Sequence, residues 1–402
     1  MSVCPGLHSL LRDFIIFVLF KIFRLLPLQN KVVATSFDGL KYADNPRFIV
    51  EALHKKDPSI KIVWLRNRNV DFEVPGYVKK VVYSNYIRSI YEFATAKVWI
   101  SSHWLNLNAQ KRKGQFYIET WHGGLGIKKL GFEFNKGMLV PEKRINHTNK
   151  IVDLYISNSK HLTNVYRNAF RYKGKILECG YPKTDFLLQN NEGLKQKILE
   201  KYGLPSNVKI LMYAPTLRAD YKRLYEGVRE IPFDVVARTL EKKTGEKWVV
   251  FLRLHPWTAY ALGSNCAEIP NAIDVTRYPE MVELAASCDA FISDYSSCIF
   301  DAAIREIPCF TYAEDYEGYR STRGVYYEMN ELPFPFAQNP DELIKNIENF
   351  NFAEYQKKWN TFKECVGLYE TGHAADDVAE LIQKRVYENQ PSLTKIIGNQ
   401  FE

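Results

Sequence analysis

The residues around His122 could carry out proton transfer. A predicted strand over 116–120 runs almost directly into His122, and Gly123 and Gly124 follow it. Imidazole titrates near neutral pH and can take a proton from a hydroxyl group, and glycines let backbone or ligand approach closely. We interpret His122 as a candidate general base, with Gly123, Gly124 and Lys128 on the acceptor or phosphate side. A histidine in an ordinary flexible loop is the alternative.

Cationic side chains follow predicted strands in the second half of the chain. Arg253 and His255 stand at the end of one strand, and Arg218 follows another. Arg323 lies in a basic loop further along the chain. Because such groups donate hydrogen bonds to phosphate oxygens, we predict that all four bind the phosphates of a donor and that His255 also takes part in catalysis. Solvated polar residues at strand ends are the alternative.

Hydroxyl and carboxylate groups gather in the segment 293–301. Asp294 ends a predicted strand, and Ser296 and Ser297 open the helix that follows. Hydroxyls beside unpaired backbone N–H groups suit a diphosphate, and Asp301, about one turn further on, could accept hydrogen bonds from ribose or polyol hydroxyls. We predict that all four side chains bind the donor. Ordinary N-capping by Ser or Asp is the alternative.

Alternating strand and helix patterns must position these residues. Short β-branched or aromatic runs recur between helical stretches such as 45–55, 85–97 and 160–170, which favours parallel sheets covered by helices. The pattern restarts near residue 206, after the turn-rich segment 203–207. The predicted strands are Lys31–Ser36, Lys61–Arg66, Val78–Tyr83, Val98–Ser101, Phe116–Thr120, Leu154–Ser157, Ile176–Glu178, Val208–Ala214, Trp248–Leu254, Ala272–Asp274, Ala290–Ser293 and Pro308–Thr311.

This pattern predicts an α/β fold of the GT-B type. In that architecture two doubly wound, Rossmann-like domains of about 200 residues each face a central cleft. We predict an N-terminal membrane-associating segment over 1–30, an acceptor-side domain over 31–205 and a donor-binding domain over 206–402. The last helix, 373–387, could cross back onto the first domain.

The N-terminal stretch 7–28 is strongly apolar but is interrupted by Lys21 and Arg24. Its uninterrupted apolar run, 14–20, is shorter than the roughly 20 residues that a spanning helix needs, and no small-residue cleavage site follows it. Apolar positions mixed with basic ones are typical of a helix that lies in the membrane interface. We predict peripheral attachment to an anionic membrane surface. Packing against the protein's own body is the alternative.

Composition narrows the classes of function. The formal net charge of +8 attracts anions, but no zinc-finger spacing, RNA-binding aromatic motif or dense Lys/Arg tract points to nucleic acid. The seven cysteines include no CxxC pair, which indicates a reducing, cytoplasmic compartment. The sequence contains no Asp-x-Asp motif or metal-binding triad, so we expect chemistry without a metal or cofactor.

In their order along the chain, these motifs resemble the CDP-glycerol glycerophosphotransferase family, the teichoic-acid glycerol and ribitol phosphate primases and polymerases. The resemblance covers nearly the whole chain and rests on the segments Ser36–Pro46, Thr120–Gly131, Gly180–Phe186, Tyr213–Asp220, Arg253–Pro256, Ser293–Asp301 and Arg323–Tyr326. Leu217 stands where the family often has an aromatic residue, and Gly124-Leu-Gly126 stands where many members have Thr-Pro-Leu.

The resemblance implies a GT-B fold and attachment to the cytoplasmic face of the bacterial membrane. It implies that His122 is the base and that His255 and the two serines bind the donor's phosphates. It also implies that Asp301 contacts the donor. The implied reaction moves glycerol phosphate or ribitol phosphate from a CDP-polyol to a hydroxyl of a teichoic-acid, capsule or undecaprenyl-diphosphate-linked glycan acceptor, and it releases CMP.

Two other functions stay open at this stage. A GT-B glycosyltransferase that uses a nucleotide sugar such as CMP-sialic acid would share the His-Pro and Ser-Ser elements. A membrane-docked scaffold could keep the fold without activity. The sequence does not distinguish glycerol from ribitol, a primase from a polymerase, or a monomer from a homo-oligomer.

Overall fold

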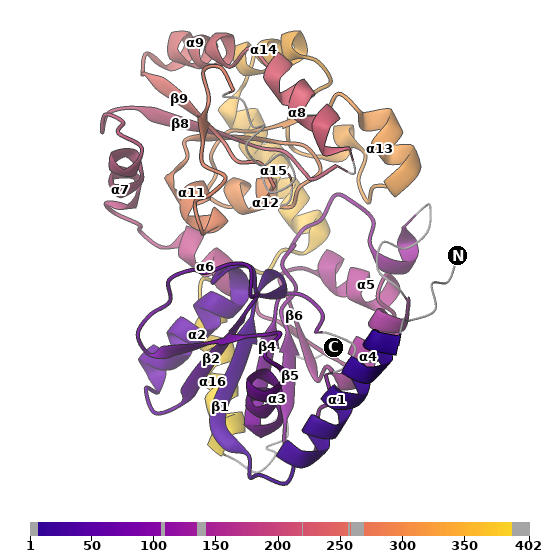
Figure 1. The fold of residues 1–402 in the computed structure, drawn as a ribbon. Coiled ribbons are helices and arrows are strands. Elements are labelled where there is room, and N and C mark those ends of the chain that lie inside the picture. Colours follow the sequence, from indigo (N-terminus) through magenta and orange to yellow (C-terminus); the bar gives the residue numbers. More distant parts are fainter. Residues whose placement is uncertain are drawn as a thin grey trace. The chain divides into compact units, whose positions relative to one another are not determined.

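The computed structural model describes residues 7–105, 109–134, 142–218, 220–255, 258 and 269–387 (Figure 1). The chain divides into two compact units. Unit 1 consists of Met1–His122, Met138–Asp185 and Tyr369–Glu402, and unit 2 of Gly123–Gly137 and Phe186–Leu368. The junction predicted at 203–207 lies inside unit 2 in this division.

Unit 1 is built on a seven-stranded sheet in which every strand is parallel to its neighbours. The strand order is β3-β2-β1-β4-β5-β6-β7. Because crossover helices cover both faces of such a sheet, its strands read as nearly continuous apolar runs, as the sequence does here. The bounds are β1 Gln29–Thr35, β2 Lys61–Arg66, β3 Val78–Val82, β4 Ala96–Ser101, β5 Phe116–Glu119, β6 Leu154–Ser157 and β7 Lys175–Glu178.

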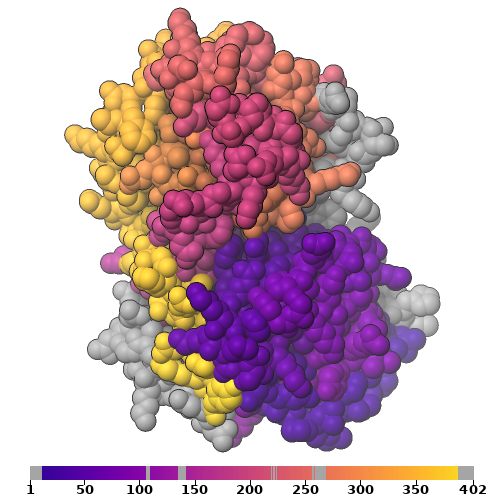
Figure 2. Space-filling view, turned by 90° about the vertical axis from the view of Figure 1, so that its left-hand side faces the viewer, coloured from indigo at the N-terminus to yellow at the C-terminus, as the bar shows by residue number. Residues whose placement is uncertain are grey.

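The helices of unit 1 come from both ends of the chain. The helix α16 (Ala374–Tyr387) belongs to unit 1 and packs against α2 (Asp44–Lys56), β1 and β4. Figure 2 shows yellow α16 residues against the indigo and purple residues of this unit. The other helices are α1 Leu7–Phe23, α3 Tyr86–Thr95, α4 Glu142–Ile151, α5 Lys160–Asn168, the short η1 Phe37–Gly39, and α6 Pro182–Leu188, which begins in unit 1.

Helix α1 packs one face on α3 and exposes the other. Ile16 and Phe20 are buried, and the ring of Phe23 meets that of Tyr91 edge-on at 5.6 Å between centroids. In the described part of the chain, no helix combines the length and apolarity needed to span a bilayer. The exposed large apolar residues in and just after α1 are Leu11, Phe14, Ile15, Phe17, Ile22, Leu25 and Leu26.

Unit 2 repeats the architecture with a six-stranded parallel sheet in the order β10-β9-β8-β11-β12-β13. Neighbouring residues of one strand enter different cores, as Leu211 and Met212 do, so both faces of the sheet are buried. The strands are β8 Lys209–Ala214, β9 Trp248–Leu252, β10 Ile273–Asp274, β11 Ala290–Ser293, β12 Cys309–Tyr312 and β13 Phe336–Ala337.

Most helices of unit 2 lie between consecutive strands, while α7 precedes the first strand and α14 and α15 follow the last. They are α7 Leu194–Lys201, α8 Tyr221–Glu230, α9 Phe233–Thr244, α11 Met281–Ser287, α12 Cys298–Ala303, α13 Tyr316–Arg323, α14 Pro340–Glu348 and α15 Phe352–Val366. Short 3-10 helices are η2 Gly131–Glu133 and η4 Met329–Glu331. The predicted α/β class with two doubly wound domains is confirmed. Strand β13 was missed; it has only two residues, and so short a run carries little periodic signal, although the equally short β10 lies within the predicted strand 272–274.

Candidate active site

His122 lies just beyond β5, and its ring is fixed on one edge by the loop after the neighbouring strand β4. The ring nitrogen Nδ1 is 3.0 Å from the carbonyl oxygen of Ser102. A carbonyl only accepts, so Nδ1 carries the proton when His122 is neutral, and the basic lone pair then belongs to Nε2. This tautomer is the one that a general base acting through Nε2 requires.

Aromatic rings surround His122. The ring of His103 stacks on it with centroids 4.0 Å apart and planes inclined by 6°. Trp121 and Phe37 follow at 4.5 Å and 5.8 Å. Burial lowers the pKa of His103 to about 4, and nearby Asp38 only partly opposes that effect. His103 is therefore a neutral stacking partner at neutral pH, and it restricts rotation of the His122 ring.

The backbone beside His122 is strained. Trp121 has φ 54°, and Phe37 and Asp38 in η1 have φ values of 48° and 54°. Left-handed backbone at residues other than glycine costs about 1–2 kcal/mol each and clusters at functional sites. Strain at this position supports a functional role for His122 over the flexible-loop alternative.

In unit 2, the predicted donor residues emerge at one edge of the sheet. β9, β8, β11 and β12 are successive parallel neighbours, so the segments that follow them leave the sheet on the same side. These segments carry Arg253 with His255, Arg218, Asp294 with the two serines, and Asp315. The structure brings the donor-side predictions together, as expected for carboxyl ends of parallel strands.

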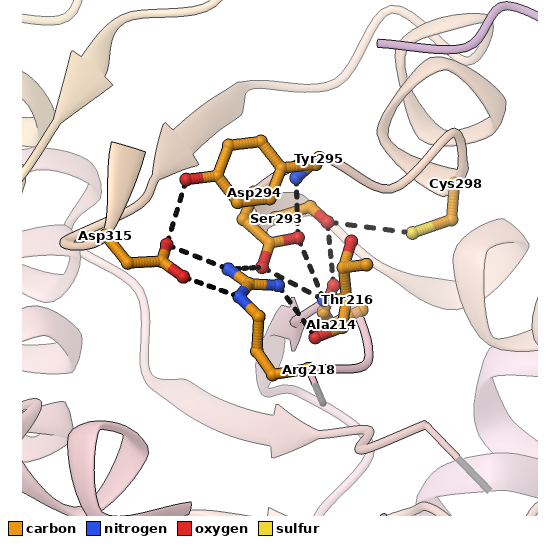
Figure 3. Close-up of polar contacts among 8 residues, drawn as sticks. All are labelled: Ala214, Thr216, Arg218, Ser293, Asp294, Tyr295, Cys298 and Asp315. Carbon is orange, nitrogen blue, oxygen red and sulfur yellow. Dashed lines mark hydrogen bonds and ion pairs between the residues drawn. The ribbon is translucent and has the colours of Figure 1, made fainter. Parts of the chain in front are cut away.

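Arg218 is held inside a network of carboxylates (Figure 3). Its guanidinium lies 2.8 Å from Asp294 and forms a fork with Asp315, with N–O distances of 2.7 and 3.1 Å. Asp294 also accepts from the backbone N–H groups of Thr216 and Tyr295 at 2.8 and 2.6 Å. Burial lowers the pKa of Arg218, but the two carboxylates outweigh it and the net shift is upward. Arg218 and Asp294 thus join three loops, and donor binding by either stays a prediction.

Lys128 lies in unit 2, with residues predicted to bind the donor. Its backbone pairs antiparallel with Val325, next to the Tyr326 N–H···O=C Ile127 bond of 2.7 Å. Burial and the nearby Arg323 lower the pKa of Lys128 to about 8, while Asp294 opposes them. Among the residues that the structure describes, no carboxylate forms an ion pair with Lys128. The positive charge of Lys128 is therefore not neutralised by an ion pair there, whereas Asp294 and Asp315 neutralise that of Arg218.

Other predicted site residues have definite places. Arg253 is buried and donates to the carbonyls of Tyr278 and Val275 at 2.8 and 3.3 Å, so it braces the backbone after β10. Ser297 is the N-cap of α12 without a capping bond from its side chain. The ordinary capping alternative therefore does not account for Ser297, but the hydroxyl of Ser296 accepts from the N–H of Cys298 at 3.5 Å, as that alternative expects.

The remaining predicted site residues lie after a strand, within or at the end of a helix, or in a connecting segment. His255 is half-buried after β9, and Asp301 is buried in the first turn of α12. Arg323 ends α13 and lies over the ring of Phe134 at 4.6 Å. Gly123 and Gly124 begin the segment that enters unit 2. Roles for all of them stay predictions.

Sequence reasoning missed His103, Asp315 and the tyrosines of the Arg218 network. Tyr295 and Tyr319 stack at 3.7 Å, and the guanidinium lies over both rings. His103 follows the predicted strand 98–101, so the strand-end rule that selected His122 also points to it. Asp315 also follows a predicted strand, 308–311, but its partner Arg218 is 97 residues away in the chain, so local sequence does not indicate the ion pair itself.

Comparison with known proteins identifies the family. The sequence profile described as CDP-Glycerol:Poly(glycerophosphate) glycerophosphotransferase matches residues 18–384. This chain belongs to that family. The predicted recognition is therefore confirmed.

Individual relatives of this glycerophosphotransferase family member agree. The teichoic acid poly(glycerol phosphate) polymerases of Staphylococcus epidermidis and Bacillus subtilis are 31% and 28% identical over 89% of this chain, and the matches cover 51% and 49% of those proteins. The chain thus spans about half the length of these two relatives. The teichoic acid glycerol-phosphate transferase of Staphylococcus aureus is 27% identical, over 92% of this chain and 97% of that protein.

Solved structures confirm the fold of the family member. The wall teichoic acid polymerase TagF superposes with a TM-score of 0.79 at 29% identity, over 96% of this chain and 98% of that one. A TagF variant with a histidine replaced by asparagine, soaked with CDPG, superposes with a TM-score of 0.77 at 30% identity.

Proposed function

We propose that this protein transfers a polyol phosphate, glycerol phosphate or ribitol phosphate, from a CDP-polyol to a hydroxyl of a teichoic-acid or related lipid-linked acceptor. Membership of the glycerophosphotransferase family supports the reaction class. The observation that carries the proposal is the geometry of His122, whose Nδ1 contact with the Ser102 carbonyl leaves the basic lone pair on Nε2.

In the proposed reaction His122 takes the proton of the acceptor hydroxyl. The acceptor oxygen attacks the phosphorus that carries the polyol, the bond from that phosphorus to the CMP oxygen breaks, and CMP leaves. Negative charge builds up on the diphosphate oxygens, and fixed cations or hydroxyls stabilise it. Lys128, His255, Ser296 and Ser297 are the groups that we assign to this task.

A donor panel tests the proposal. Purified protein is incubated with CDP-glycerol, CDP-ribitol or a CMP-sugar and a lipid-linked acceptor analogue, and CMP release and product mass are measured. We expect CMP release from one or both CDP-polyols, added mass of a polyol phosphate, and turnover that persists in EDTA. His122→Ala should abolish turnover and leave donor binding largely intact.

The competing functions predict other outcomes in the same assay. Transfer from the CMP-sugar alone would identify a glycosyltransferase. Donor binding without turnover of any donor would identify an inactive scaffold. A His122→Ala protein with near-normal turnover would contradict the assignment of the base.

We also propose that α1 attaches the protein to an anionic membrane surface on the cytoplasmic face. The exposed side chains of Phe14, Phe17 and Ile22 offer apolar area on the face that α3 leaves uncovered, and Lys21 places a cation among them. Such a helix binds through buried apolar area and attraction to anionic lipids. Attachment there would keep the protein near a lipid-linked acceptor.

A further inference from the structure

The peptide that leads into His122 is held from several directions. Trp121, with its left-handed backbone, donates its N–H to Glu119 Oε1 at 3.0 Å. The carbonyl of Trp121 accepts from the hydroxyl of Thr120 at 2.9 Å. Both contacts join residues one or two positions apart, at the end of β5.

Two further contacts come from distant parts of the chain. The Asn45 side-chain amide donates to the Trp121 carbonyl at 3.2 Å, and Lys183 Nζ donates to the His122 carbonyl at 3.0 Å. The two segments also bind each other, because the backbone N–H of Lys183 donates to Asn45 Oδ1 at 3.1 Å. Asn45 and Lys183 therefore hold consecutive carbonyl groups of the strained peptide and fix each other's position.

Both side chains are buried, with exposed fractions of 0% for Asn45 and 5% for Lys183. Burying an ammonium group costs several kcal/mol of desolvation that its contacts must offset. Lys183 Nζ also lies 5.9 Å from the centroid of the Tyr181 ring, so the ammonium group is held in place at the His122 carbonyl. Exact placement of the imidazole matters for the reaction, because displacement of a reacting group by about 1 Å can cost about 100-fold in rate.

We propose that Asn45 and Lys183 are positioning residues for His122, which hold the carbonyls of Trp121 and His122 and so fix the backbone from which the imidazole projects. The inference rests on the proposed function of His122 as the base. Neither residue needs to touch a substrate, and both act through the peptide.

The test compares Lys183→Met with a matched loss of another buried lysine. Lys31 in β1 is 2% exposed and bonds to Glu92 and Thr95 at 2.5 and 2.6 Å, on α3. We expect Lys183→Met to lower kcat by about 10- to 100-fold with KM for the CDP-polyol and the affinity for CMP unchanged. Lys31→Met should reduce the melting temperature at least as much but keep kcat, measured below both transitions.

Two further variants keep the test decisive. Lys183→Arg, which retains a cationic donor, should recover part of kcat. Asn45→Ser, a milder change, should lower kcat in the same direction if Lys183→Met does not fold.

The outcomes separate the two hypotheses. Normal kcat in Lys183→Met, or a loss of kcat no larger than that of Lys31→Met, would overturn the positioning role. Normal turnover in His122→Ala would instead overturn the proposed base.

Discussion

The Arg218 guanidinium contacts two carboxylates and two tyrosine rings, so this cation holds loops of unit 2 together. A buried ion pair adds little net stability compared with an apolar pair, but removal of one partner leaves a buried charge without compensation. Removal of the cation would leave Asp294 buried with only its backbone N–H donors, and would leave the half-buried Asp315 with the Tyr295 hydroxyl.

Arg218→Met should therefore destabilise unit 2 by roughly 3–5 kcal/mol, and Arg218→Lys by less, because an ammonium keeps the charge but loses the fork. Calorimetry gives the overall change, and hydrogen exchange at residues 214–216 and 293–295 locates it. Arg320 in α13 forms an exposed ion pair with Glu328, so Arg320→Met is the control and should change little. Unchanged stability with a raised KM for the CDP-polyol would show that Arg218 binds the donor instead.

Glu119 gives a second test at the residue scale. Burial raises the pKa of its carboxyl to about 8, although hydrogen bonds from Tyr117 and Trp121 partly oppose that shift. The folded protein thus binds this proton more tightly than the unfolded chain, whose glutamate has a pKa of about 4.5. Between those two values the free energy of unfolding should fall as pH rises.

Glu119→Gln should remove this dependence. The difference in unfolding free energy between pH 5.5 and pH 8, measured by urea denaturation, should shrink by up to about 3 kcal/mol. Replacement of the exposed Glu73 by Gln should leave the difference as in the wild type. The same slope in Glu119→Gln and wild type would show that the carboxyl is ionised throughout.

At the scale of elements, the segment Gly180–Phe186, which follows β7, packs against residues at and just before the start of α16. Gly180 has φ 92°, and a Cβ there would lie 2.6 Å from the carbonyl oxygen of Tyr369. Asp185 Oδ2 accepts from the N–H of Ala375 at 2.7 Å in the first turn of α16. Several residues of the motif thus have structural roles in docking the last helix.

Gly180→Ala should destabilise unit 1 by more than the backbone strain alone. Gly193 is the matched control, because it has φ 76° and no atom within 4 Å of an added Cβ. Gly193→Ala should cost about 1 kcal/mol, and Gly180→Ala should cost at least about 2 kcal/mol more because backbone atoms must move. Hydrogen exchange should show faster opening of α16 in Gly180→Ala only. Equal effects of both substitutions would refute the close-packing argument.

At the scale of the whole molecule, α1 should decide where the protein resides. Replacement of Phe14 and Phe17 by Gln should lower the partition constant onto vesicles of phosphatidylglycerol and phosphatidylcholine, measured by sedimentation, by at least about 100-fold, because the two side chains together lose about 3–6 kcal/mol of apolar burial. The paired change of Ile87 and Phe352, also exposed, to Gln is the control and should not alter sedimentation. Equal sedimentation of both variants would contradict attachment through α1.

The strands of both sheets could be predicted from the sequence more accurately than the side-chain contacts between distant segments. Strands such as Lys61–Arg66 and Leu154–Ser157 have the predicted bounds, because buried parallel strands are short β-branched runs bounded by turns. The strand ends then indicated His122 and the donor-side residues. Asn45 and Lys183 could not be assigned in this way, because their contacts with Trp121 and His122 span 76 and 61 residues. Pairing over such distances follows from the fold rather than from local pattern.

The return of α16 to unit 1 also bears on synthesis of the chain. Ribosomes release the strands of unit 1 first, but the helix that packs on α2 emerges only after all of unit 2. Once the preceding part of unit 1 ends at Asp185, the apolar face of α2 must stay uncovered while nearly 200 further residues are translated, which takes roughly 10–40 s at ordinary elongation rates. During that interval the nascent chain should be a substrate for chaperones. A ribosome that stalls before residue 374 should leave unit 1 without α16, with the apolar face of α2 still uncovered.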